Sequence, residues 1–175
     1  MIRNLWNDLE GTFFPESALD YMPAPRLREV QLQRLKAVTT LAYERVALFR
    51  GRMDAKGVKP ADVRKLDDVR LLPFGTKSDL RDTYPYGLFA VPMSEVVRLH
   101  ASSGTTGKPI VVGYTAQDME VWKQVIMRTL YAAGYGRGDV VQNMFGYGLF
   151  TGGLGLHGGL EGIGATVIPI SGGNS

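Results

Sequence analysis

The sequence lacks cysteine altogether and has only two histidines, His100 and His157, among its 175 residues. Without cysteine the chain can form no disulfide, no thiolate nucleophile and no cysteine-ligated metal site. The two histidines lie far apart in the sequence, so we assign no metal ligand to this chain. A signal peptide is not expected, because Arg3, Asp8 and Glu10 interrupt the stretch that would have to be apolar. These absences predict a cytoplasmic protein.

The chain also lacks a large net charge, since 20 Lys and Arg residues against 17 Asp and Glu residues give a formal net charge of only +3. No block of basic residues accompanies it, so we expect no nucleic-acid partner. The uncharged stretch 140–160 is long enough to cross a bilayer, but its two amide side chains, one histidine and seven glycines argue against a membrane span. A composition of 45% hydrophobic and 21% charged residues is that of a soluble globular protein.

The first half of the chain is poor in glycine and rich in charge, which predicts a helical region. Only five of the 22 glycines precede His100. Pro25 suits the first position of a helix, and apolar residues recur at the helical period from there to about Arg50. Gly51 and the stretch 54–60 are expected to end that helix. A helical turn is expected at 60–64, and a short helix after 76, with Thr76 or Ser78 as its N-cap.

The second half predicts strands alternating with helices. Strands are expected at 96–100, 110–114, 140–144 and 166–170. Thr115, with Asp118 three residues on, predicts a helix N-terminus, and Gly134 its end. The expected inner stripe of that helix is Trp122, Val125, Ile126, Thr129, Leu130 and Ala133.

The last two strands and the glycine-rich segment between them predict a right-handed parallel β-α-β unit. The fold class is therefore α/β: a helical N-terminal region followed by part of a mixed or parallel β-sheet flanked by helices. We expect no helix after the last strand, which would leave one face and one edge of the sheet bare. The bare edge makes self-association, such as a homodimer, an expectation. It also suggests either a short tail or the N-terminal piece of a longer protein.

The stretch 102–109, Ser-Ser-Gly-Thr-Thr-Gly-Lys-Pro, carries the clearest chemical signal. Glycines allow consecutive backbone N–H groups to converge on an anion, hydroxyls donate to phosphate oxygens, and Lys108 adds a positive charge. A Walker A loop is excluded, because that pattern needs four residues between its glycines and Ser or Thr after the lysine. No serine-hydrolase elbow is present either. A plain turn between two strands remains the alternative to phosphate binding.

The sequence HASSGTTGKP at 100–109 resembles the phosphate loop of the adenylate-forming enzymes, and specifically of the phenylacetate–CoA ligases. The stretches LRDTYPYGLFAVP at 80–92, GYGLFTGGLG at 146–155 and ATVIPISGG at 165–173 are similar to further segments of that family, in the same order. The resemblance covers nearly the whole chain. Two departures are Gly75, where a second threonine is usual, and a glycine beside His157, where an aromatic residue is common.

The resemblance implies an ATP-dependent arylacetate–CoA ligase that forms an acyl-adenylate and then a thioester, with ATP, Mg²⁺ and CoA as co-substrates and a small aromatic carboxylate as substrate. It implies that the polyphosphate is held by Ser102, Ser103, Gly104, Thr105, Thr106, Gly107 and Lys108. It places the aryl pocket at Phe145, Gly146, Tyr147, Phe150, Gly152 and Gly153. For Tyr147 a packing role is equally open. His100 is expected to support the loop through a hydrogen bond, and His157 to pair with Glu161 on a helix surface.

The resemblance also implies a protein of several hundred residues. Residues 1–94 would be the helical N-terminal region of its large domain, and 95–175 the phosphate-loop and β-α-β part of the same domain. The acidic magnesium ligand, the ribose-binding aspartate and the C-terminal domain with the catalytic lysine would lie elsewhere, so no catalytic residue is assigned here. The alternatives are a non-catalytic nucleotide- or acyl-binding module, one half of a split ligase, and a purely structural or dimerisation piece.

Overall fold

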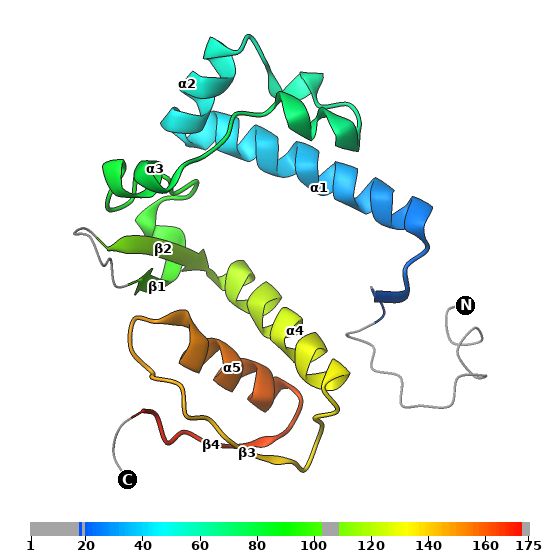
Figure 1. Cartoon of the computed structure of the whole chain (residues 1–175), viewed down its shortest axis with the longest axis vertical. Coiled ribbons are helices and arrows are strands. Elements are labelled where there is room, and N and C mark those ends of the chain that lie inside the picture. The colour runs from blue at the N-terminus through cyan, green and yellow to red at the C-terminus, as the bar shows by residue number, and fades with distance from the viewer. Residues whose placement is uncertain (1–17, 19, 103–108, 173–175) are drawn as a thin grey trace. The chain divides into compact units, whose positions relative to one another are not determined.

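The computed structural model of the chain describes residues 18, 20–102 and 109–172 (Figure 1). The chain forms two compact units. One, here the hairpin unit, comprises Pro23–Met119 with Gly148–Thr151, and the other, here the α/β unit, comprises Met1–Met22, Glu120–Tyr147 and Gly152–Ser175. Each is described by itself.

The hairpin unit begins with two consecutive helices, α1 (Ala24–Arg45) and α2 (Ala47–Ala55). A single helix to about Arg50 was expected. That prediction is wrong in two respects: the helix is interrupted before Arg50, and the helical region continues beyond Arg50. Val46 adopts an extended conformation (φ −109°, ψ 103°) and interrupts the helix, and Gly51 lies inside α2 rather than after it. Val46 is only 6% exposed and shares the core of this unit with Met53 and Val63. The break therefore directs the apolar side chain of Val46 toward the core, and it occurs without a proline or glycine at that position.

Four short elements and a hairpin complete this unit. The 3₁₀ helices η3 (Pro60–Asp62) and η4 (Leu66–Leu71) precede α3 (Lys77–Asp82), and η5 (Met93–Glu95) leads into β1 (Val96–Ser102). Thr76 is the N-cap of α3, as one of the two expected caps. Strand β2 (Ile110–Thr115) pairs with β1 in antiparallel fashion, with Ser102 opposite Ile110. The two strands thus hold both ends of the segment 103–109 next to each other.

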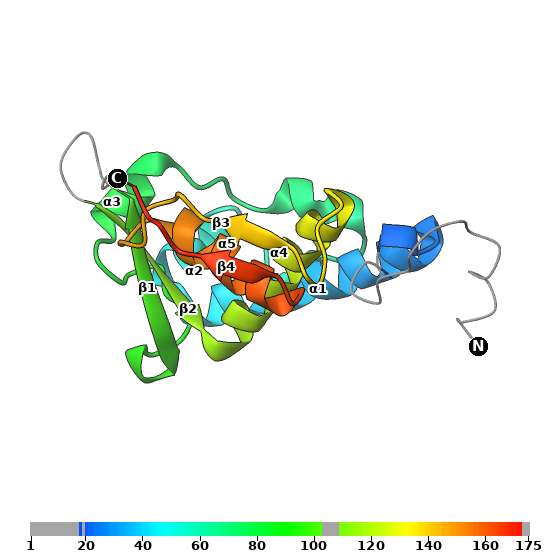
Figure 2. The same cartoon turned by 90° about the horizontal axis from the view of Figure 1, so that it is seen from below.

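The α/β unit contains most of α4 (Ala116–Ala132), then β3 (Val140–Gln142), α5 (Thr151–Gly162) and β4 (Thr166–Ile168). Strands β3 and β4 are parallel, with Val141 opposite Val167, and lie side by side in Figure 2. The expected β-α-β unit is confirmed, although each strand is two residues shorter than predicted. Positive φ angles of 88° at Gly134 and 93° at Gly138 match the expected helix end and turn.

Helix α5 packs on α4 through glycines at 155, 159 and 162. A Cβ atom at Gly155 would lie 2.6 Å from Trp122 Cε2, and one at Gly159 would lie 2.7 Å from Ile126 Cβ. The core beside them consists of Met127, Leu130, Leu160 and Ile163. The inner face of α4 was predicted in part: Ile126 and Leu130 face the core, whereas Val125, Thr129 and Ala133 are exposed and Met127 was missed. Because α5 presents glycines at these positions, the bulkier side chains of α4 pack directly against the backbone of α5.

Among the described residues, no helix is both long enough and apolar enough to cross a membrane.

Candidate functional site

The β1–β2 hairpin carries the loop that the sequence assigns to phosphate. Of the assigned residues, Ser102 ends β1 and is exposed. Ser103, Gly104, Thr105, Thr106, Gly107 and Lys108 lie outside the described residues. Pairing of Ser102 with Ile110 brings the two ends of the loop together.

His100 connects this hairpin to the segment 148–151 within the same unit. Its side chain is 2% exposed, and Nδ1 lies 2.9 Å from the Leu149 carbonyl oxygen. A carbonyl can only accept, so Nδ1 carries the proton and donates. The backbone N–H of Ala101 donates to the same oxygen at 3.0 Å. The expectation that His100 is hydrogen-bonded is confirmed, with the carbonyl of Leu149 as its partner, whereas its expected support of the loop stays a prediction because residues 103–108 lie outside the described residues.

In the α/β unit, Asn143 follows β3 and is 1% exposed. Its Nδ2 donates to the Tyr147 hydroxyl at 2.8 Å and to the Gly153 carbonyl at 3.0 Å, while its Oδ1 accepts from the Phe145 N–H at 3.2 Å. One buried amide therefore joins the residues at both ends of the glycine-rich segment. Sequence reasoning missed this role, although a polar residue at the end of an apolar strand was a signal that could have found it.

Tyr147 continues the network into α5. Its hydroxyl lies 3.0 Å from His157 Nδ1, and the Nε2 of His157 lies 3.1 Å from Glu161. The Tyr147 and His157 rings meet edge to face, with centroids 5.6 Å apart. The expected His157–Glu161 pair is confirmed, whereas the Tyr147 partner was not foreseen.

The structure brings four of the six residues assigned to the aryl pocket together. Phe145, Gly146, Tyr147 and Gly153 meet in the α/β unit, where a Cβ at Gly153 would lie 3.2 Å from the Phe145 carbonyl oxygen and would collide with that of Gly146. Gly152 adjoins them in the chain. Phe150 belongs to the hairpin unit. The rings of Phe145 and Phe150 are 54% and 60% exposed, so both offer apolar surface to a ligand.

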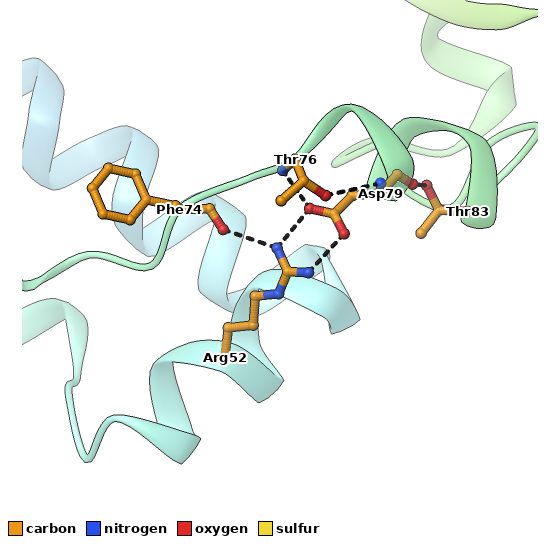
Figure 3. Close-up of polar contacts among 5 residues, drawn as sticks. All are labelled: Arg52, Phe74, Thr76, Asp79 and Thr83. Carbon is orange, nitrogen blue, oxygen red and sulfur yellow. Dashed lines mark hydrogen bonds and ion pairs between the residues drawn. The ribbon is translucent and has the colours of Figure 1, made fainter.

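A separate polar cluster joins α2 to α3 in the hairpin unit (Figure 3). Both terminal nitrogens of Arg52 donate hydrogen bonds to the Asp79 carboxylate at 2.6 Å, and one of them also donates to the Phe74 carbonyl at 2.9 Å. Hydrogen bonds from Arg52, and then from the Thr76 N–H, hold the pKa of the Asp79 carboxyl well below its ordinary value. The pair borders an apolar pocket of about 560 Å³ between α1, α2 and α3. Its bidentate geometry indicates a structural clamp.

No group of three or more acidic, histidine or cysteine side chains in the described part of the chain could hold a metal ion.

Comparison with curated proteins gives 55% identity over 155 residues to a phenylacetate–coenzyme A ligase of Thermus thermophilus, which covers 89% of this chain and 35% of that protein. The enzymes of the same name from Escherichia coli and Pseudomonas putida are each 56% identical, over 85% and 98% of this chain. The chain is a homologue of the phenylacetate–coenzyme A ligases. It spans about a third of the length of these ligases, and the matched third is their N-terminal portion. No family model matches the chain.

Solved structures extend the relationship from sequence to fold. A 2-hydroxyisobutyryl-CoA ligase, crystallised with 2-HIB-AMP and CoA in the thioesterification state, matches with a TM-score of 0.81 at 29% identity, over 87% of this chain and 33% of that one. The same ligase in its postadenylation state matches with a TM-score of 0.79. The mixed α/β fold class and the resemblance to the phenylacetate–CoA ligases are therefore confirmed.

Proposed function

We propose that this chain forms the N-terminal part of an ATP-dependent arylacetate–CoA ligase. In the first half-reaction a carboxylate oxygen would attack the α-phosphorus of ATP, and the bond to pyrophosphate would break. In the second, the CoA sulfur would attack the acyl carbon, and AMP would leave. The observation that carries the proposal is the 54–56% identity to ligases named for phenylacetate, since these relatives cover nearly all of this chain.

ATP would be bound at the hairpin loop. The hydroxyls of Ser102, Ser103, Thr105 and Thr106 and the ammonium of Lys108 would contact the β- and γ-phosphates, with Gly104 and Gly107 allowing close approach of the backbone. The antiparallel pairing up to Ser102 and Ile110 supports this assignment, because it fixes both ends of the loop. Mg²⁺ would neutralise charge on the polyphosphate when bound, and we assign it no ligand in this chain.

The acyl acid would lie against the segment 145–153. Phe145 and Phe150 would supply flat apolar surfaces for an aryl ring, and Gly146, Gly152 and Gly153 would leave room for it. The solved relatives are named for an aliphatic hydroxy acid, so support for an aryl substrate comes from the more similar phenylacetate ligases. Residues 1–94 and 95–175 would both belong to the large domain of such a ligase.

The test begins with ATP binding by the 175-residue chain, measured by calorimetry with and without Mg²⁺. We expect Lys108→Ala to weaken binding roughly tenfold or more, because it removes a charge-assisted contact to phosphate. Lys36→Ala, at an exposed position of α1, is the matched control and should bind as the parent chain does. Equal binding by Lys108→Ala and the parent would contradict the assignment of the loop.

The second arm measures thioester formation from phenylacetate, ATP and CoA. We expect the 175-residue chain to form none alone, and the full-length polypeptide to form phenylacetyl-CoA and AMP. Turnover by the 175-residue chain would refute the proposed division of labour. ATP binding with turnover only after addition of a separate second polypeptide would instead favour one half of a split ligase, a candidate that the one-third coverage of the relatives brings forward.

A further inference from the structure

Four polar side chains of the α/β unit form one continuous chain of contacts, here the Asn143 relay: Asn143, Tyr147, His157 and Glu161. The contacts run from a buried amide to an exposed carboxylate, at 2.8 Å, 3.0 Å and 3.1 Å in turn. The exposed fraction of the side chain rises along the relay, from 26% at His157 to 64% at Glu161. The relay therefore links a buried point beside β3 to the solvent-facing side of α5.

The donors and acceptors of the relay can be ordered in only one consistent way when His157 is neutral. The Nδ2 of Asn143 can only donate, so the Tyr147 oxygen accepts from it. The Tyr147 proton is then free to be donated to His157 Nδ1, which must be unprotonated. The remaining ring proton lies on Nε2 and is donated to the carboxylate of Glu161. The geometry thus assigns His157 the tautomer with its proton on Nε2.

The relay fixes both ends of the segment that the proposed function gives to the acyl acid. Asn143 accepts from the N–H of Phe145 on one side and donates to the carbonyl of Gly153 on the other. Tyr147 lies between these two points in the chain and is held by Asn143 and by His157. Loss of the Tyr147 hydroxyl would leave a buried amide proton unpaired and would remove the contact of Tyr147 with His157 of α5.

We propose that Tyr147 and His157 are positioning residues of the acyl site, which set the placement of Phe145 and Gly153 for an aryl ring and make no hydrogen bond to the acid themselves. The inference rests on the proposed function and deepens it. The hydroxyl of Tyr147 is engaged by two protein partners, Asn143 and His157, so it is not available to the acid.

The kinetic test uses Tyr147→Phe in the full-length ligase, with Tyr135→Phe as the matched control. Tyr135 follows α4, is 41% exposed and lies outside the relay. For Tyr147→Phe we expect the KM for phenylacetate to rise about fivefold, the value for one lost hydrogen bond, with kcat changed less than twofold. Tyr135→Phe should change neither. A merely structural role would lower the melting temperature of Tyr147→Phe and leave its KM at the parent value, and that result would overturn the inference.

Substitution of His157 supplies the rescue. In His157→Gln the Oε1 atom can accept from Tyr147 while Nε2 donates to Glu161, so we expect a KM within twofold of the parent. In His157→Leu neither contact remains, and the KM should rise as in Tyr147→Phe. The double variant Tyr147→Phe/His157→Leu should show no further increase, because both substitutions remove the same contact. Equal KM values for the Gln and Leu variants would contradict the proposal.

A readout that does not depend on turnover comes from nitrogen NMR of the 175-residue chain. We expect the parent to show His157 protonated at Nε2 and unprotonated at Nδ1, and the Nδ1 signal to move in Tyr147→Phe. The opposite tautomer would refute the relay whether or not the ligase is active. A parent ligase that makes no phenylacetyl-CoA would refute the proposed function, whereas an active parent with an unchanged KM in Tyr147→Phe would refute the positioning role alone.

Discussion

Two neighbouring glycines of α5 allow the contact between α4 and α5 to be tested with one pair of substitutions. Gly158 and Gly159 lie in the interior of the same helix, so alanine removes the same backbone entropy cost at either position. Their surroundings differ completely. A Cβ at Gly158 would meet nothing within 4 Å, whereas one at Gly159 would lie 2.7 Å from Ile126 Cβ and 3.4 Å from the Ile126 carbonyl carbon.

The expected effects therefore have opposite signs. Gly158→Ala should raise the free energy of unfolding by about 1 kcal/mol, the usual difference between glycine and alanine inside a helix. Gly159→Ala gains the same amount but must push α4 and α5 apart, because Ile126 is β-branched and its Cβ cannot rotate away. Overpacking of this kind costs roughly 1–3 kcal/mol, so we expect a net loss of about 1 kcal/mol. The two variants should differ by about 2 kcal/mol.

Urea unfolding of the 175-residue chain, followed by circular dichroism, measures both values. The melting temperatures should separate in the same sense, by roughly 2–4 °C for each kcal/mol. Stabilisation of both variants would show that α5 does not approach α4 through Gly159, and it would refute the packing described here. Destabilisation by Gly158→Ala would equally contradict the open surroundings of that position.

Three further predictions concern the local contacts. Hydrogen bonds lower the pKa values of the Asp54, Asp68 and Asp79 carboxyls in the folded state, so the unfolded chain binds more protons. The stability that these carboxylates contribute should therefore be fully present above about pH 4 and should be lost as the pH decreases further. Asp79→Asn should make that loss smaller, as measured by urea unfolding at a series of pH values. Thr115→Ala removes the hydroxyl that accepts from the Asp118 N–H at 3.1 Å and should lower the free energy of unfolding by about 1 kcal/mol. The control Thr40→Ala, at an exposed position inside α1, should cause no such loss. Met53→Ala, at a side chain with 0% exposure, should lower it by about 2–5 kcal/mol, and an unchanged value would contradict the assigned core.

Features that depend on neighbouring residues could be predicted from the sequence. The cap at Thr115 was predicted because a hydroxyl three residues before an acidic side chain satisfies the free N–H groups of a helix start, and Thr76 was one of two expected caps for the shorter helix. The turns at Gly134 and Gly138 need φ angles that only glycine adopts without strain. The parallel pairing of β3 with β4 followed from the spacing of two apolar stretches around a helix.

Features that depend on distant packing could not be predicted in this way. The periodicity of apolar residues runs on past Val46, so the break between α1 and α2 has no local signal; it reflects burial of Val46 in the core of the hairpin unit. The inner face of α4 was placed partly wrong because glycines have no hydrophobicity to indicate the partner helix. The spacing of Gly155 and Gly159, a motif of close helix packing, was the available clue, and it describes contact with α4.

The candidate site also contains features that depend on neighbouring residues and features that depend on distant packing. The phosphate-binding role of the loop 102–108 comes from its residue types and from the family resemblance, because hydroxyls, glycines and a lysine in one short stretch suit phosphate binding, and it stays a prediction. The contacts of Asn143 and the contact of His157 with Tyr147 were not predicted, since each depends on which groups the folded segment brings within 3.0 Å, whereas the pair of His157 with Glu161 follows from their spacing on one helix. A sequence pattern therefore identifies the groups that would touch the ligand more readily than the groups that hold them in place. For this chain, Tyr147 marks the boundary: its aromatic ring made it a candidate for the pocket, and its hydrogen bonds show that its hydroxyl is committed to the protein.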